Sequence, residues 1–344
     1  MGTAITSLII KKTISFGELR GKILIVDTHN ILYQFLSSIR QRDGTLLMDS
    51  KGNVTSHLAG LFTRTTNLMK KSVKLAFVFD GKVPELKFAE RERRRGIKQE
   101  AQKQYEIAKQ RGDIEAMRKY ASRLSKLTTK MIEESKLLIS YLGLPVIQAP
   151  SEAEAQAAFI VSKGHAFACV SQDMDSLLFR ATKLIRNLTV SRRRKIKGKS
   201  SYETIKPEII KLSENLNNLG IDQDQLIVLA MLVGTDYNVG GVKGIGPKTA
   251  LKLVKKHGKD FNNLFKEAKW SKSFDYPWKD VFSLIKKMPV TKNYNLEWKQ
   301  PQPKKIFDLL VKEHDFSEKN VTKTLKFLRK QERAGKQKGL GEWF

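Results

Sequence analysis

The sequence lacks the residues on which several classes of protein depend. It contains one cysteine, Cys169, which excludes an intramolecular disulfide and a cysteine-based zinc finger. The longest uncharged apolar run, at 226–234, is too short to span a bilayer, and the N-terminal residues do not resemble a secretion signal. The five histidines are scattered, with no H-E-x-x-H pattern. These absences favour a protein of a reducing, intracellular compartment.

Acidic residues are also scarce. The 344 residues include 35 Asp and Glu against 64 Lys and Arg, a formal net charge of +29 with a pI near 10. Such a charge attracts polyanions, and nucleic acid is the leading candidate. The length permits one large or two ordinary domains, and a hydrophobic content of 40% is enough for a folded core.

The pattern of apolar residues predicts an α/β fold with a mostly parallel central sheet flanked by helices. Short runs that are apolar on both faces are typical of buried parallel strands. Strands are expected at 22–26, 74–79 and 166–171, and helices at 31–39, 55–70, 222–234 and about 316–333. A further helix is expected to begin at 150–152, with Ser151 as N-cap and Glu154 as its capping partner. After residue 260 the pattern becomes irregular.

The segment 82–136 has a different character. It holds 16 Lys or Arg against 9 Asp or Glu, and its composition predicts two basic helices that are broken near residues 111–113. A solvated helical insertion is the plain interpretation. The net positive charge also suits a path for a phosphate backbone. A second basic stretch, at 191–200, is expected to form a loop or hairpin tip.

Several carboxylates stand where a polar residue needs an explanation. Each of four follows an apolar strand directly, two open a predicted helix, and one ends an apolar helix: Asp27, Asp80, Asp173, Asp175, Glu152, Glu154 and Asp236. The carboxyl ends of parallel strands open onto one crevice, so these groups could share a site. A single Asp after a strand is more often a turn residue or helix N-cap. Two closely spaced acidic pairs weaken that alternative.

A cluster of seven carboxylates repels itself unless cations bind there. Ligands that offer only oxygen favour Mg²⁺ or Mn²⁺ over zinc. Two such ions, about 4 Å apart, can clamp a scissile phosphate and activate water. The sequence therefore predicts a divalent-metal site for phosphodiester hydrolysis.

The segment 225–257 predicts a helix-hairpin-helix motif. Two helices, at 225–234 and 247–257, flank a glycine hairpin, and Pro247 stands in the first turn of the second helix. Small glycines allow a DNA phosphate to approach backbone N–H groups at a helix N-terminus. The candidate contacts are Lys243, Gly244, Gly246, Lys248 and Lys252. A tight helical turn with a lysine-rich surface remains the alternative. A nucleotide-binding P-loop is excluded, because a helix precedes the glycines where a strand is required.

Five motifs together resemble the flap endonucleases of archaeal and eukaryotic type. They are VDTHNILYQFLSSIRQRDG, VFDGKVPELK, QAPSEAEAQAA, SQDMDSLLF and LVGTDYNVGGVKGIGPKTAL, and they cover nearly the whole chain in order. The resemblance implies a PIN-like nuclease core, a helical arch and a helix-hairpin-helix with a potassium ion. It also implies that the seven carboxylates bind two Mg²⁺ ions, for which Mn²⁺ can substitute.

The resemblance extends to individual residues. Lys87 and Arg94 match the cations that contact the scissile phosphate from the base of the arch, and Tyr33 matches an aromatic that stacks on a base. The other implied DNA contacts are Gly2, Arg40, Thr55, Arg64, Lys98, Arg123, Lys126 and Phe316. Asn320 stands where a basic residue is common in the family. For Lys87 and Arg94, two solvated cations among many is the plain alternative.

The C-terminal tail resembles the box with which proteins bind a sliding clamp. Its residues are Gln337, Leu340, Trp343 and Phe344. Docking of the two aromatics on the protein's own core is the alternative. The predicted parts are 1–98 and 116–258 for the nuclease core, 82–136 for the arch, about 225–257 for the helix-hairpin-helix, 259–335 for a C-terminal helical region and 336–344 for the tail.

These features predict a monomeric, structure-specific 5′ flap endonuclease that acts in DNA replication and repair. A secondary 5′–3′ exonuclease activity is expected from the same metals. A non-catalytic, clamp-associated binder of DNA junctions would keep the basic charge, the hairpin motif and the tail, but would not need seven carboxylates. A related junction-resolving or gap nuclease is a third possibility, which the arch sequence and the tail disfavour.

Overall fold

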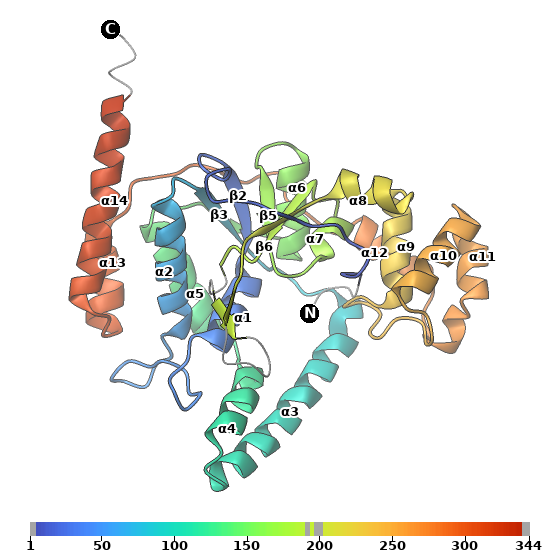
Figure 1. Cartoon of the computed structure of the whole chain (residues 1–344), viewed down its shortest axis with the longest axis horizontal. Coiled ribbons are helices and arrows are strands. Elements are labelled where there is room, and N and C mark those ends of the chain that lie inside the picture. The colour runs from blue at the N-terminus through green and yellow to red at the C-terminus, as the bar shows by residue number, and fades with distance from the viewer. Residues whose placement is uncertain (1–4, 190–192, 196–201, 339–344) are drawn as a thin grey trace.

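A computed structural model of the chain describes residues 5–189, 193–195 and 202–338. Its centre is a seven-stranded sheet with the order β1-β9-β6-β5-β2-β3-β4 (Figure 1). The strands are β1 (Lys12–Thr13), β2 (Ile23–Asp27), β3 (Lys74–Phe79), β4 (Val146–Gln148), β5 (Ala168–Val170), β6 (Lys183–Arg186) and β9 (Glu208–Lys211). A separate hairpin joins β7 (Arg193–Lys195) to β8 (Tyr202–Thr204).

The five strands from β6 to β4 are parallel, whereas β9 and β1 add an antiparallel edge. The expectation of a mostly parallel sheet is therefore confirmed. Strand β3 has the predicted bounds, because its apolar run is long and flanked by polar residues on both sides. The predicted hairpin at 191–200 lies partly outside the described residues.

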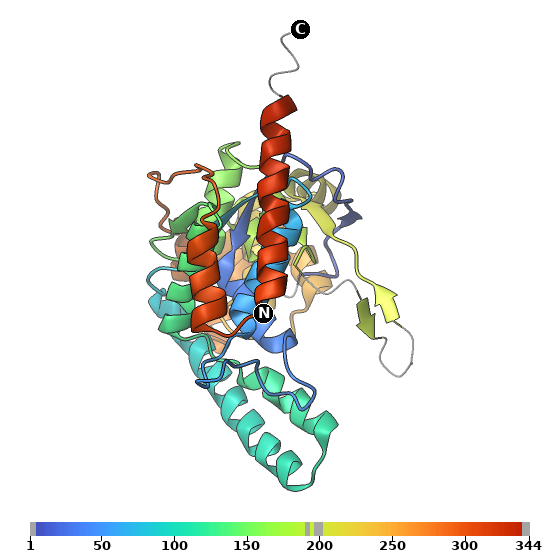
Figure 2. The same ribbon diagram turned by 90° about the vertical axis from the view of Figure 1, so that its left-hand side faces the viewer.

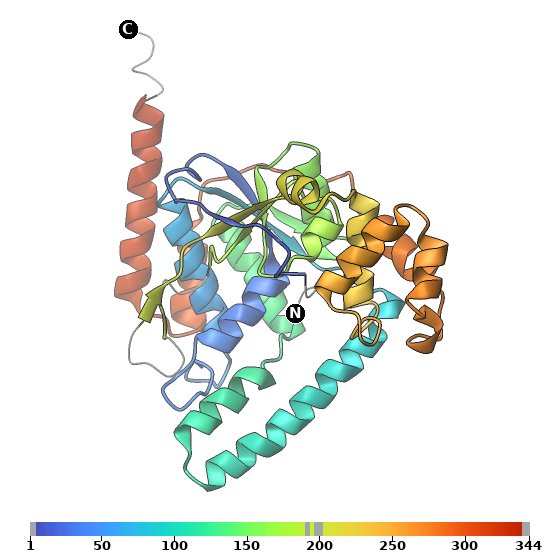
Figure 3. The ribbon, with the colours of Figure 1, turned by 45° about the vertical axis from the view of Figure 1, so that its right-hand side comes forward.

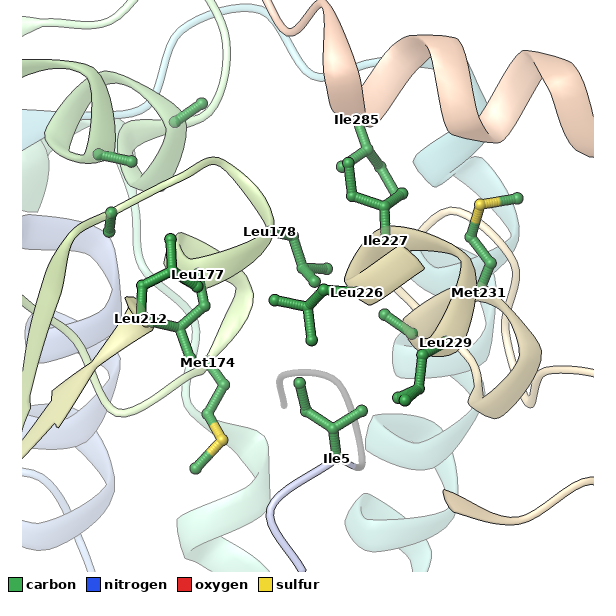
Figure 4. Packing of buried hydrophobic residues seen from close by; sticks show 14 of the residues in the cluster. Ile5, Met174, Leu177, Leu178, Leu212, Leu226, Ile227, Leu229, Met231 and Ile285 are labelled. Carbon is green, nitrogen blue, oxygen red and sulfur yellow. The ribbon is translucent and has the colours of Figure 1, made fainter. Parts of the chain in front are cut away.

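Helices cover both faces of the sheet, because successive residues of a strand point to opposite sides. Along β2, Leu24 and Val26 join the hydrophobic cluster beneath α1 (Thr28–Ser38), α2 (Ser56–Met69) and α5 (Thr129–Tyr141). Ile25 joins the other cluster, together with α6 (Ala153–Ser162), α7 (Asp175–Leu178), α8 (Leu212–Leu219) and α9 (Gln223–Val233). Figure 4 shows Leu226 of α9 beside Leu178 of α7, with Ile227 of α9 on another side of the same helix beside Ile285.

A long helical hairpin extends away from this body (Figures 1 and 3). It consists of α3 (Phe88–Gln110) and α4 (Ile114–Ala121), which pack against each other, preceded by η1 (Glu85–Lys87) and followed by η2 (Ser122–Leu124). The break between the helices falls at the predicted place. Gly112 there has a positive φ of 66°, and the Asp113 side chain accepts a hydrogen bond from the backbone N–H of Ala116. The second helix is short, since the chain turns back toward the body at η2.

Short helices follow α10 (Pro247–His257) in the segment where the apolar pattern is irregular: α11 (Phe261–Glu267), η3 (Trp270–Lys272) and α12 (Trp278–Lys286). Residues 287–302 form no helix or strand. Helices this short carry little periodic signal. Their aromatic side chains instead pack on one another: the ring of Phe265 stacks on Trp278 with 4.7 Å between centroids and meets Trp270 edge to face at 5.1 Å.

The chain then crosses to the opposite side of the molecule. It forms α13 (Pro303–Phe307), the π-helix η4 (Asp308–Glu313) and α14 (Glu318–Lys338), whose far end projects beyond the body (Figure 2). The predicted last helix at about 316–333 is present but extends further. Among the described residues, no helix is both long and apolar enough to cross a membrane.

The close approach of α1 and α2 depends on the absence of a side chain at Gly60. A Cβ at this position would collide with the ring of Phe35 and with Ile39. A Cβ built on Gly96, within α3, would have no other heavy atom within 4 Å.

We expect Gly60→Ala to lower the free energy of unfolding by about 2 kcal/mol, because the core would be overpacked. The matched change Gly96→Ala should not lower it, since alanine favours a helix. Urea denaturation measures both, and equal effects would contradict this account.

Candidate active site

The predicted carboxylates gather at the carboxyl edge of the parallel strands. Asp27 ends β2, Asp80 follows β3 and Asp173 follows β5. Because β2 pairs with both β3 and β5, their ends lie side by side at the centre of the sheet. Glu152 and Glu154 stand at the start of α6, after β4. Asp236 follows α9 in a turn that Asn238 fixes by donating a 2.6 Å hydrogen bond to the carbonyl of Met231.

Asp27 has two roles in this arrangement. One oxygen, Oδ1, accepts a hydrogen bond from the backbone N–H of Asn30 and so caps α1, as the plain interpretation of the sequence expected. The other oxygen, Oδ2, lies 3.3 Å from Oγ of Ser171. Oε1 of Glu154 lies 3.1 Å from the same hydroxyl. A serine hydroxyl has one proton to donate, so the buried carboxylate of Asp27 and the half-buried carboxylate of Glu154 compete for it.

The start of α6 differs from the predicted capping box. Its N-cap residue is Glu152, without a side-chain capping bond, and the Ser151 hydroxyl donates to the carbonyl of Lys82 instead. The helix is capped from outside: Oδ1 of Asp80 accepts a 2.7 Å hydrogen bond from the backbone N–H of Ala153. A sequence pattern cannot show a cap that comes from another strand. The same contact ties Asp80 to the positive end of a helix.

Asp173 and Asp175 complete the acidic edge. The side-chain amide of Asn30 donates a 2.9 Å hydrogen bond to Oδ2 of Asp173. The carbonyl oxygen of the same amide accepts from the backbone N–H of Gln172. Asp175 opens α7, and its charge acts on Glu154. Asn30 therefore holds the segment after β5 against the start of α1.

Two cations from the base of α3 lie among these carboxylates. Nζ of Lys87 is 2.7 Å from Oε2 of Glu152 and 3.4 Å from Oδ2 of Asp236. The guanidinium of Arg94 donates a 3.0 Å hydrogen bond to the same oxygen of Asp236. The buried carboxylate of Glu90 accepts from Nε of Arg94 and thereby orients it. Lys87 and Arg94 thus lie among the carboxylates, and their contact with a scissile phosphate stays a prediction.

Burial and mutual repulsion perturb the acidic groups. Burial, followed by the charge of Asp80, raises the pKa of Asp27 well above its usual range. Burial, followed by the charges of Asp175 and Asp27, does the same to the pKa of Glu154. Burial also raises the pKa of Glu152, although Lys87 opposes this shift. For Lys87, the attraction of Glu152 and Asp236 outweighs burial, and its pKa is raised.

The residues fit a hard divalent cation by their chemistry. The carboxylates offer only oxygen, and Asp27 and Glu154 share one hydroxyl proton, an arrangement that a bound cation would relieve. In the part of the chain that the structure describes, no group of three or more His, Cys, Asp or Glu is arranged to hold a metal as it stands. Lys87 and Arg94 supply the positive charge instead. Metal binding would therefore require these side chains to shift.

Sequence reasoning missed four residues that hold the site together: Ser171, Asn30, His29 and Glu90. The ring nitrogen Nδ1 of His29 lies 3.3 Å from Oδ2 of Asp80. The spacing of Glu90 and Arg94, one helical turn apart, was a signal that could have been used. Ser171 and Asn30 act across more than 100 positions, and no local pattern reveals such pairs.

The predicted DNA contacts are spread over several parts of the fold. Tyr33 on α1 is 43% exposed, with Nζ of Lys98 5.9 Å from its ring centroid. Lys98 and Arg40 both hydrogen-bond to Ser125, which joins the hairpin of α3 and α4 to the body. Arg123 and Lys126 are exposed beside this junction, and Arg64 on α2 and Phe316 after η4 are half-buried. Thr55 is only 5% exposed.

The remaining predicted DNA contacts lie in the helix-hairpin-helix, between α9 and the first turns of α10. Helix α10 has the predicted bounds, with Pro247 in its first turn, and α9 packs against it. Lys243, Gly244, Gly246, Lys248 and Lys252 are all exposed. Gly244 has a positive φ of 83°, which explains the need for glycine there.

Some predicted residues cannot be placed. Gly2, Leu340, Trp343 and Phe344 lie outside the described residues, and Gln337 is described only as part of the backbone of α14.

Comparisons with known proteins show the family to which the chain belongs. The family described as the XPG N-terminal domain matches residues 4–101, and the XPG I-region matches residues 143–236. The chain therefore has the nuclease core of the XPG class. It is 49% identical over 333 residues to flap endonuclease 1 of Hyperthermus butylicus, covering 96% of this chain and 95% of the relative. It is 48% identical over 344 residues to that of Pyrococcus horikoshii, covering 100% and 98%. The chain belongs to the flap endonuclease family.

Solved structures show the same fold. Flap endonuclease-1 from Methanococcus jannaschii matches with a TM-score of 0.75 and 40% identity, over 95% of this chain and 98% of that one. The catalytic core of Rad2 in complex with DNA substrate matches with a TM-score of 0.67 over 92% and 96%, at 24% identity, which shows likeness of fold alone. The protein is a structure-specific nuclease that acts on DNA.

The raised pKa values of Asp27 and Glu154 predict how stability depends on pH and metal. Groups whose pKa is raised by folding favour the folded state at low pH and oppose it as pH rises through the folded pKa. We expect Mg²⁺ to raise the melting temperature more at pH 8 than at pH 5.5. Glu154→Gln should stabilise the metal-free protein at pH 8 by about 1–2 kcal/mol and reduce the Mg²⁺ effect.

The matched control for this experiment is Glu133→Gln, which changes an exposed carboxylate on α5. It should change the free energy of unfolding by less than about 0.5 kcal/mol. The rise in melting temperature with Mg²⁺ should be the same as in the unmodified protein. An Mg²⁺-induced rise in melting temperature that is equal at both pH values, or a loss of stability in Glu154→Gln, would contradict this account. Either result would show that the negative charges of Asp27 and Glu154 do not destabilise the metal-free fold.

Proposed function

We propose that the protein is a divalent-metal-dependent 5′ flap endonuclease, which hydrolyses a phosphodiester near the junction of branched duplex DNA. One observation supports this above all. Seven carboxylates, several of them buried, meet Lys87 and Arg94 in one place at the edge of a sheet. A protein that only bound DNA would gain nothing from placing so much negative charge where a phosphate must approach.

Mg²⁺ is the metal we propose, with Mn²⁺ able to substitute, and two ions per chain fit the number of carboxylates. The ligands would be Asp27, Asp80, Glu152, Glu154, Asp173, Asp175 and Asp236. When bound, such ions supply activated water and stabilise charge on the scissile phosphate. The remaining steps depend on the chain's own residues.

Lys87 and Arg94 would contact the scissile phosphate. Both are paired with carboxylates in this structure, so charge neutralisation of those carboxylates frees the two cations for the phosphate. Glu90 keeps Arg94 directed toward the site. The positive charge would then stabilise the negative charge that develops on the phosphate as the bond breaks.

DNA binding would rely on the backbone of the nucleic acid, and therefore on its shape. The exposed lysines and glycines of the helix-hairpin-helix would hold duplex phosphates, with a potassium ion bound at the hairpin. Tyr33 would stack on a base near the cut, and the hairpin of α3 and α4 would enclose the single-stranded flap. The contacts of Gly2, Arg40, Thr55, Arg64, Lys98, Arg123, Lys126 and Phe316 belong to this proposal.

The cellular role we propose is lagging-strand maturation and repair, by an intracellular monomer with secondary 5′–3′ exonuclease activity. The tail would bind a sliding clamp through Gln337, Leu340, Trp343 and Phe344. Aromatic side chains buried at an interface often contribute most of the binding energy, and Trp343 and Phe344 would do so here.

A chain that ends at Lys336 should keep flap cleavage and lose clamp binding in a pull-down. Equal binding by both chains would contradict the role of the tail.

Cleavage of a 5′-labelled double-flap DNA tests the proposed activity. With Mg²⁺ we expect one main incision near the junction, which chelator and Asp175→Asn both abolish while DNA binding persists. Lys87→Ala should slow single-turnover cleavage by about 100-fold with little change in affinity. The control Lys82→Ala removes an exposed lysine five positions earlier and should cleave normally. Tight binding without cleavage in Mg²⁺ or Mn²⁺ would favour a non-catalytic junction binder.

A further inference from the structure

A cavity lies at the amino edge of the parallel strands, the edge opposite to the carboxylates. Its volume is about 520 Å³, which suits a small-molecule ligand. The residue before β2, Lys22, lines it, together with Phe167 before β5 and Lys183 at the start of β6. Asp27 ends β2, so one strand length, roughly 16 Å, separates the cavity from the acidic site.

The wall of the cavity carries positive charge and no carboxylate. Among the lining residues that the structure describes, the titratable ones are Lys22, Lys183 and His165. The neighbouring strand does not compensate the two lysines. Lys211, which stands opposite Lys183 in β9, already pairs with Glu214, and that carboxylate also binds a second lysine. The cavity therefore holds unbalanced positive charge, which favours an anionic occupant.

Both ammonium groups lie against a single aromatic ring. Nζ of Lys183 is 4.5 Å and Nζ of Lys22 is 5.4 Å from the centroid of Phe167. A contact of this kind at an exposed site is weaker than a hydrogen bond between an ammonium group and an anionic oxygen. An anion that enters the cavity can therefore draw both lysines away from the ring and leave the ring open to a second contact.

The carboxyl end of α6 borders the cavity without cancelling this charge. The last carbonyl groups of a helix carry partial negative charge. Here the carbonyl of Ile160 accepts a hydrogen bond from the backbone N–H of His165, and that of Val161 accepts one from Gly164. Nδ1 of His165 lies 2.6 Å from the hydroxyl of Tyr294, which fixes its ring. The turn thus satisfies its own carbonyl groups and forms a defined wall.

We propose that this cavity is a second binding site, which holds one nucleotide with its phosphate on Lys22 and Lys183 and its base against Phe167. A site for a bare anion would not need an aromatic wall, whereas an aromatic ring can stack on any base. A free nucleoside monophosphate and a nucleotide within a single strand share this chemistry. Because the cavity lies away from the acidic edge, the inference does not depend on flap cleavage.

Titration calorimetry of the full chain with dAMP, in the presence of chelator, tests this site. The double variant Lys22→Gln/Lys183→Gln should bind dAMP at least about tenfold more weakly than the unmodified protein, because the phosphate loses its charged donors. Phe167→Leu, which keeps most of the apolar bulk, should also weaken binding. The matched control is Lys163→Gln. Lys163 lies 5.6 Å from the ring of Phe159 at the end of α6 but does not line the cavity, so binding should be unchanged.

The source of the nucleotide is decided by a second ligand, a single strand of four deoxyadenosine nucleotides. A site for a strand should bind it at least as tightly as dAMP, and a site for the free nucleotide should bind it more weakly. Only the part of the binding that the double variant loses is compared.

Three results would overturn the proposal. They are equal dAMP binding by the double variant and the unmodified protein, no binding at millimolar dAMP, and equally tight binding of inorganic phosphate or a tetraglutamate peptide. Should the double variant not fold, NMR of the unmodified protein with dAMP decides. Magnetisation transfer between the base protons and the ring of Phe167 supports the site, and its absence refutes it.

Discussion

Crowding of negative charge at the carboxyl edge of the parallel sheet is the constraint on which the rest of the structure depends. Parallel pairing of β2 with β3 and β5 brings Asp27, Asp80 and the segment after β5 together whatever else the chain does. Carboxylates so placed need compensating positive charge. In this structure it comes from Lys87 and Arg94 at the base of α3. The start of the helical hairpin of α3 and α4 therefore forms part of the acidic site.

The surrounding fold keeps this charge in place. Hydrophobic clusters on both faces of the sheet fix the strand ends, and single polar residues then set the orientation of each carboxylate. Ser171 joins Asp27 to Glu154, the first turn of α6 binds Asp80, and Glu90 directs Arg94. Away from this edge, the Asp49 side chain pairs with His314, and the backbone N–H of Ser50 donates to Asp315, so polar contacts also attach the loop before α2 to the segment after η4.

Much of this was predictable from the sequence, for identifiable physical reasons. Long apolar runs bounded by polar residues gave β3 its bounds, and Pro247 after a glycine hairpin placed the start of α10. The acidic residues could be grouped because parallel strands end at one edge. Contacts between distant segments could not be predicted. Ser151 matched the pattern of an N-cap, but Asp80 caps this helix from another strand, and the short helices after residue 260 carry too little periodicity for their bounds to be predicted.

The central claim is that divalent ions take over the role of Lys87 and Arg94 among the seven carboxylates. Anomalous scattering from crystals of the full chain grown with Mn²⁺ tests it most directly. The account predicts two anomalous peaks among these carboxylates, about 4 Å apart, with the ammonium of Lys87 displaced from Glu152. An acidic edge without any peak, or one in which Lys87 keeps both of its ion pairs at saturating Mn²⁺, would contradict it.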